Sequence, residues 1–154
     1  MGLFIMKNSV CCIGDPDIKY TTDMWKKTDR MMGELIKKGT TRFLFGKCSD
    51  FSNLCFYIAS VYKRTNPEIS RIKIKLDESE KEYGICGAMD DYDKTVILKL
   101  SENSEETKDF RRYRAMIYKS DTCIFYCDAR SDGDAARAYR YAAQKNKRII
   151  NCFE

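Results

Sequence analysis

The chain has 154 residues, of which 44% are hydrophobic and 33% charged, values typical of one globular domain with a single core. No stretch of about 18 apolar residues occurs, which excludes a membrane-spanning helix, and residues 1–6 lack the features of a signal peptide. We therefore expect one cytoplasmic domain with no membrane partner. The net charge of +5 is uneven, since residues 107–148 carry eleven Lys or Arg against five Asp. This basic half suits a phosphate-bearing ligand or a nucleic acid, and a solvated face explains it equally well.

Cysteine and histidine content limits the chemistry of the chain. There are eight cysteines and no histidine, and no Cys-x-x-Cys pair occurs, so we expect no metal site and no cofactor. Most of the cysteines lie in apolar runs, where buried, reduced thiols are expected. The missing histidine removes the usual general base and every Ser-His or Cys-His nucleophile, and we assign no catalytic residue.

Short apolar runs alternate with helical patterns along the whole chain. Strands are predicted at Ser9–Ile13, Arg42–Phe45, Arg71–Leu76, Thr95–Leu100, Thr122–Cys127 and Arg148–Phe153. Amphipathic helices are predicted around the stripes Met24-Thr28-Met31-Leu35, Phe51-Leu54-Cys55-Ile58-Val61-Tyr62 and Phe110-Tyr113-Ile117, and an alanine-rich helix at Asp134–Lys145. This alternation predicts an α/β fold, a doubly wound Rossmann-like parallel sheet with helices on both faces.

In such a sheet the ligand crevice lies outside the carboxyl ends of the strands, where the strand order reverses. Three loops there follow a strand and precede a helix: Gly14–Tyr20, Gly46–Asn53 and Asp128–Asp134. In the first loop, Gly14 is followed by Asp15 and Asp17, and such paired acids serve acid–base chemistry or hold a ribose. Turn formation is the competing explanation for these residues.

The second loop combines Gly46 and Lys47 with the helix-capping residues Ser49 and Asp50. Backbone amides at a helix start attract phosphate or carboxylate, and Lys47 adds positive charge. The sequence is neither a Walker loop nor a dinucleotide fingerprint, and an ordinary capped turn is the alternative.

The third loop is the strongest local feature of the sequence. Asp128 ends a buried strand, Gly133 permits a positive φ, and Asp132 or Asp134 is expected to cap the following helix. The helix opens with small residues, which let a ligand approach the backbone. The phosphate of such a ligand is expected to pair with one or more of Arg112, Arg130 and Arg137.

Taken together, the loops resemble the SLOG superfamily, and particularly its YpsA-like branch of phage and Gram-positive bacterial proteins. The resemblance rests on the Cys11–Gly14 strand end, on the Gly46–Asp50 turn and on a late run. That run comprises Arg112 to Met116, Ser120-Asp121, Thr122–Cys127, Asp128, Gly133 to Ala135 and Tyr141-Ala142. The resemblance as a whole covers about residues 7–153.

The resemblance implies binding of a nucleotide-derived small molecule such as an ADP-ribose-type second messenger, as a sensor or a phage anti-defence protein. It also implies self-association. The related Lonely-guy phosphoribohydrolases carry a catalytic Glu in the last loop, where this chain has Ala138. An N-glycoside hydrolase or deoxyribosyltransferase using Asp15, Asp50 or Asp128 is the alternative, and the missing Glu argues against an enzyme.

A third hypothesis is a factor that binds nucleic acid or another protein through a basic helix, although a nucleic-acid partner is not expected. The basic helix around Arg111, Arg112 and Arg114 would need exposed aromatic side chains beside it to stack bases. Its aromatic residues Phe110 and Tyr113 have the spacing of core positions.

Overall fold

The structure is a computed structural model, and it describes residues 5–76, 92–99 and 105–153. Within these residues six strands form one sheet in the order β4-β3-β2-β1-β5-β6, and every neighbouring pair is parallel. The strands are β1 (Ser9–Gly14), β2 (Arg42–Phe45), β3 (Ser70–Lys75), β4 (Lys94–Ile97), β5 (Thr122–Tyr126) and β6 (Arg148–Asn151). The predicted parallel sheet is therefore confirmed, and each observed strand overlaps a predicted one.

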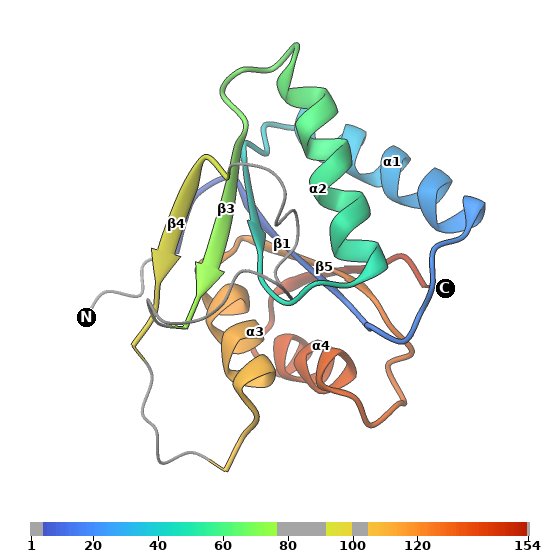
Figure 1. The fold of residues 1–154 in the computed structure, drawn as a ribbon, viewed down its shortest axis with the longest axis vertical. Helices are drawn as coiled ribbons and strands as arrows, with labels where there is room; N and C mark the ends of the chain where they lie inside the picture. The colour runs from blue at the N-terminus through green and yellow to red at the C-terminus, as the bar shows by residue number, and fades with distance from the viewer. Residues whose placement is uncertain (1–4, 77–91, 100–104, 154) are drawn as a thin grey trace.

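In the described part of the chain, four helices cover the sheet, two on each face (Figure 1). They are α1 (Thr22–Lys37), α2 (Asp50–Lys63), α3 (Lys108–Lys119) and α4 (Asp134–Gln144). Alternate residues of β1 point to opposite faces: Val10 and Cys12 pack with α1 and α2, whereas Cys11 and Ile13 pack with α3 and α4. Because both faces are covered, β1 and β5 are buried along their whole length. The fold is the doubly wound arrangement that the sequence predicts.

The helices follow the predicted apolar stripes with small shifts. In α1, Met32 is fully buried. Met31, which was predicted on the buried stripe, is only partly buried. Val61, expected on the buried stripe of α2, is 40% exposed. Phe110 and Tyr113 of α3 are buried, as predicted.

None of the seven cysteines of the described residues forms a disulfide with another of them, and six are buried: Cys11, Cys12, Cys55, Cys123, Cys127 and Cys152. Cys86 lies outside the described residues. In the described part of the chain, no Cys, Asp or Glu side chains form a group of three or more that could hold a metal ion. None of the described helices is long and apolar enough to cross a membrane.

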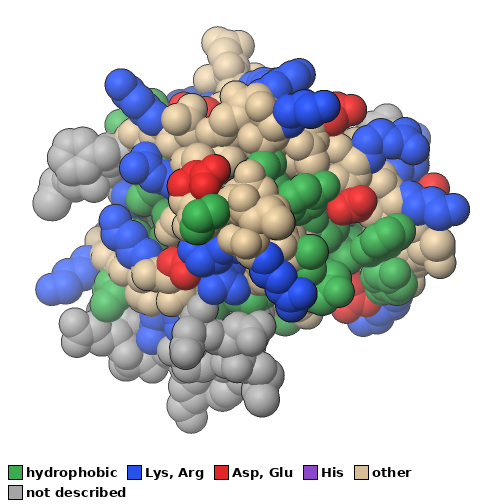
Figure 2. Space-filling model, turned by 90° about the horizontal axis from the view of Figure 1, so that it is seen from above, with side chains coloured by type: hydrophobic (Ala, Val, Ile, Leu, Met, Phe, Trp, Pro, Cys, Tyr) green, Lys and Arg blue, Asp and Glu red, His purple; other side chains and the backbone are tan. Residues whose placement is uncertain are grey.

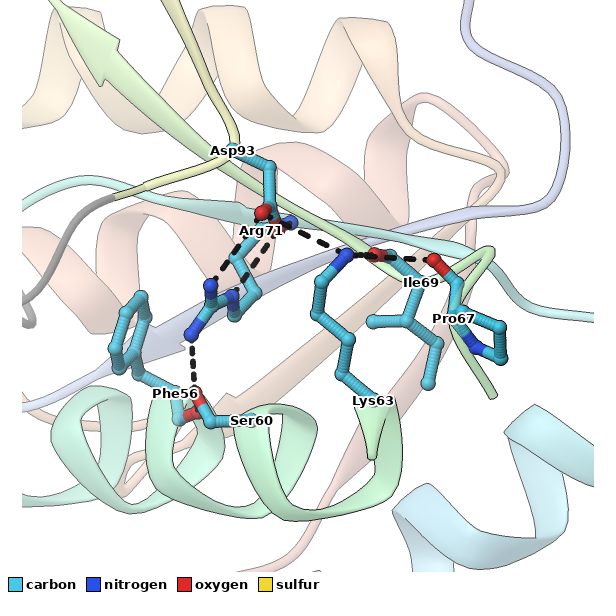
Figure 3. Close-up of polar contacts among 7 residues, drawn as sticks. All are labelled: Phe56, Ser60, Lys63, Pro67, Ile69, Arg71 and Asp93. Atoms are coloured by element: carbon cyan, nitrogen blue, oxygen red, sulfur yellow. Dashed lines mark hydrogen bonds and ion pairs between the residues drawn. The ribbon is translucent and has the colours of Figure 1, made fainter. Parts of the chain in front are cut away.

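A polar cluster joins β3, β4 and α2 at the amino-terminal edge of the sheet (Figure 3). Asp93, just before β4, accepts hydrogen bonds from the Arg71 amide at 2.7 Å and from the Arg71 Nε at 3.1 Å. The Arg71 guanidinium also donates to the Ser60 hydroxyl and lies over the Phe56 ring. Lys63 forms an ion pair with Asp93. Charge and hydrogen bonds thus fix the β3–β4 pair against α2 at the edge opposite the three candidate loops.

Candidate functional site

The strand order reverses between β1 and β5, and this position defines the candidate site. From β1 the chain passes to α1 on one face, whereas from β5 it passes to α4 on the other. The two loops therefore separate at the carboxyl ends of these strands, where α/β sheets bind ligands. They stay joined at their base, because the Asp15 amide donates to the Tyr126 carbonyl at 3.0 Å.

The first loop is packed against the start of α2. A Cβ on Gly14 would lie 2.7 Å from both Phe51 Cβ and Ser49 Oγ, so only glycine permits this approach. Ser49 is buried and caps α2 by accepting the Ser52 amide at 3.0 Å. Packing thus accounts for Gly14 and Ser49, and ligand binding by them remains a prediction.

The carboxylates of Asp15 and Asp50, in the first two loops, accept hydrogen bonds from backbone amides. Asp15 Oδ1 accepts the Asp17 amide at 2.9 Å, which forms a local turn. Asp50 Oδ2 accepts the Tyr20 amide at 2.8 Å, which joins the end of the first loop to the start of α2. Asp15 therefore makes the turn contact that the sequence offered as an alternative to chemistry, whereas Asp50 lies in the first turn of α2 and leaves the capping to Ser49.

The second loop lies against α3. A Cβ on Gly46 would approach Arg112 Cδ to 2.6 Å, so the glycine makes room for the arginine side chain. Arg112 is only 3% exposed, and its burial lowers the pKa of the guanidinium. Asp109 contacts both cations, lying 3.5 Å from Arg112 Nη1 and 3.5 Å from Lys47 Nζ. Arg112 therefore supports the floor of the loop, while Lys47 is the partly exposed cation.

In the third loop, Asp128 Oδ1 accepts the Arg130 amide at 3.0 Å, and this hydrogen bond lowers the pKa of the Asp128 carboxyl. The Arg130 side chain is 91% exposed. Arg140 donates to the carbonyls of Ala129 and Ser131, which ties this loop to α4. Asp128 is thus ionised and Arg130 faces solvent above the loop.

Two expectations for this loop are wrong. Gly133 has a φ of −71° rather than a positive value, and it occupies the N-cap position of α4 itself. Neither Asp132 nor Asp134 caps the helix, because Asp134 already lies in its first turn. The Asp134 carboxylate instead accepts the Thr107 hydroxyl at 2.9 Å and contacts Arg137 Nη1 at 3.4 Å.

The start of α4 differs from the starts of the other three helices. Thr21, Ser49 and Thr107 each accept the backbone amide three residues ahead, whereas the N-cap residue of α4 is Gly133, which has no side chain to cap the helix. A Cβ on Gly133 would meet no described atom within 4 Å. The first turn of α4 therefore begins without a side-chain cap and with free space beside Gly133, an arrangement that favours a bound anion.

Sequence reasoning missed Thr107, which belongs to this region. Its hydroxyl caps α3 by accepting the Phe110 amide at 3.1 Å. A threonine three residues before the first apolar position of a helix is a recognisable capping signal. Its contact with Asp134, 27 positions away, has no comparable signal.

The fold and the open helix start define an α/β protein of the Rossmann-like class with its candidate site at the strand ends. No protein family and no curated protein matches the sequence. Among solved structures, the chain is similar to the molybdenum cofactor binding protein from the phototrophic bacterium Rippkaea orientalis, with a TM-score of 0.58 and 17% identity. The match covers 93% of this chain and 74% of that one. At this identity the likeness shows a shared fold.

Proposed function

We propose that the chain binds a small, phosphate-bearing, nucleotide-derived molecule at the strand ends of β1 and β5. The observation that carries this proposal is the uncapped start of α4 at the point where the strand order reverses. Three helices satisfy their first-turn amides with a Ser or Thr side chain, and α4 has none. An anion seated there would complete the helix as a side-chain cap completes the others.

Two further features support this ligand class. Arg130 is exposed beside the helix start, and a guanidinium pairs with phosphate in fixed, bidentate geometry. The structural neighbour is described as binding the molybdenum cofactor, a small molecule.

The finer proposal follows the resemblance to the SLOG superfamily and its YpsA-like branch. The ligand is then an ADP-ribose-type second messenger or a related compound, which the protein senses or, in a phage, sequesters. Asp15 and Asp128 follow the ends of the adjacent strands β1 and β5, where each carboxylate would accept a hydrogen bond from a ribose hydroxyl.

The test begins with small molecules released by heat from the purified protein and identified by mass spectrometry. Calorimetry then compares the identified compound on wild type and on Gly133→Val, Arg130→Ala and Arg64→Ala. The Gly133 position is open and its φ of −71° suits valine, so this variant should fold normally. Arg64, exposed at the far end of α2, provides the matched control for Arg130.

We expect Gly133→Val to block binding and Arg130→Ala to weaken it about ten- to hundred-fold, the value of a charge-assisted hydrogen bond. Arg64→Ala should bind like wild type. Wild-type affinity in both site variants would exclude this site. Release of a free base from the ligand would show an enzyme instead, and Asp15 and Asp128 would be the first residues to replace.

A further inference from the structure

A pocket of about 720 Å³ lies at the amino-terminal edge of the sheet, opposite the loops described above. The first residues of β2, β3 and β4 and the last turn of α3 line this pocket. Ile72 and Val96 form part of its wall on the face of the sheet that packs with α3. Thr41 and Ser70 add hydroxyl groups at the strand starts.

Lys119, the last residue of α3, lines this pocket although it is only 4% exposed. Within the described residues its ammonium forms no ion pair or hydrogen bond. Burial lowers the pKa of this ammonium, and the nearby Lys94 lowers it further. A buried charge is costly unless an opposite charge compensates it.

The other charges of the pocket do not neutralise Lys119. Lys94 and Arg42 are also cations, and Glu68 is the one acid among the described lining residues. Neither Lys94 nor Glu68 has a salt-bridge partner within the described residues. The nearby Lys63 differs, because Asp93 and the Ile69 and Pro67 carbonyls surround its ammonium (Figure 3). The pocket therefore carries uncompensated positive charge.

We propose that this pocket is a second ligand site, which binds the phosphate group of a small organic anion. Lys119 supplies the buried charge, Lys94 and Arg42 supply charge nearer the surface, and the Thr41 and Ser70 hydroxyls donate hydrogen bonds. The apolar wall of Ile72 and Val96 takes the uncharged part of the ligand. The volume lies within the range of about 300–1,000 Å³ that ligand pockets occupy.

Inorganic pyrophosphate is the probe for the anion alone. Calorimetry at low ionic strength should detect its binding to the wild-type protein and at least ten-fold weaker binding to Lys119→Met, which keeps the apolar stem and removes the charge. Lys99→Met, an exposed lysine outside the pocket, should bind like wild type. Without pyrophosphate, Lys119→Met should melt at a higher temperature than wild type, because it no longer buries an uncompensated charge.

Two further variants make the outcome decisive. Lys94→Gln changes an exposed residue, so it tests the same pocket if Lys119→Met fails to fold, and we expect several-fold weaker binding. Gly133→Val should leave pyrophosphate binding to this pocket intact. Unchanged affinity in both lysine variants overturns the proposal. Loss of pyrophosphate binding in Gly133→Val alone places the anion at the start of α4, which supports the proposed function and refutes the second site.

Discussion

Thr107 and Asp134 connect the starts of two helices. The Thr107 hydroxyl accepts the Phe110 amide within α3 and donates to Asp134 Oδ2 in the first turn of α4. One side chain therefore caps α3 and positions the helix start that we propose to bind phosphate.

Replacing Thr107 with valine keeps the shape of the side chain and removes its hydroxyl. We expect the free energy of unfolding to fall by about 1–2 kcal/mol, since a helix cap and a hydrogen bond to a carboxylate are lost. Thr107→Ser retains the hydroxyl and should stay close to wild type. Urea unfolding measures both variants, and equal losses in serine and valine would show that the hydroxyl has no such role.

Gly46 and Gly133 should respond differently to alanine. A Cβ on Gly46 would collide with Arg112 Cδ at 2.6 Å and Met116 Sδ at 2.8 Å, whereas a Cβ on Gly133 meets open space. We expect Gly46→Ala to cost about 1–3 kcal/mol of unfolding free energy through overpacking. Gly133→Ala should leave stability within about 0.5 kcal/mol of wild type. Thermal and urea unfolding of the two variants test the contrast, which fails if both behave alike.

Asp93 should make the stability of the protein depend on acid pH. Partial burial raises the pKa of its carboxyl, but hydrogen bonds and charge from Arg71 and the charge of Lys63 outweigh burial and lower that pKa overall. The ionised carboxylate therefore stabilises the folded state above about pH 4, the pKa of an aspartate carboxyl in the unfolded chain. This contribution is lost as the pH falls through the lower pKa of the carboxyl in the folded protein. We expect Asp93→Asn to cost about 1–2 kcal/mol at pH 7 and to flatten the acid limb of stability. Asp132→Asn, at an exposed position, serves as the control, and an equal pH profile in both variants would contradict the prediction.

The thiols should differ sharply in reactivity. Burial raises the pKa of the Cys11 and Cys12 thiols, and it raises that of Cys152 to about 11. Cys48 is partly exposed, so among the described cysteines it should react first with iodoacetamide in the native protein. Peptide mass spectrometry locates the label, with Cys48→Ser as the control. After denaturation without reductant, close to eight thiols should react. Recovery of only half of them would indicate disulfides.

Self-association remains a prediction, and the structure suggests where to test it. Trp25 on α1 is 39% exposed, and Tyr57 and Val61, one turn apart on α2, are 62% and 40% exposed. Figure 2 views the molecule from above relative to Figure 1. On this surface, hydrophobic side chains gather between charged ones. We expect light scattering to give twice the chain mass of 18.0 kDa, and Tyr57→Glu to give the monomer. A monomer at micromolar concentration in the wild type would refute the prediction.

The fold was predictable because its signals are local. Buried strands such as Thr122–Tyr126 are continuous apolar runs, and the helices between them show an apolar stripe. Short strand–helix–strand connections then allow few topologies other than a parallel, doubly wound sheet. The same local signals placed the three loops at one edge of the sheet.

The details of the site depend on contacts between residues far apart in the sequence. Asp134 was expected to cap α4, but Thr107 draws its carboxylate toward α3. Gly46 was predicted to take part in ligand binding, whereas the buried Arg112 side chain fills the space beside it. Lys119 gave no signal at all, since a lysine in the last turn of a helix is ordinarily solvated.

The two outer strands of the sheet, β4 and β6, influence how copies of the chain can associate. The outer strands β4 and β6 are four residues long, and they begin with Lys94 and Arg148. Short, charged edge strands resist strand-by-strand addition, the route by which exposed edges extend into aggregates. A complex of two copies would therefore join through helix surfaces, and the two six-stranded sheets would remain separate.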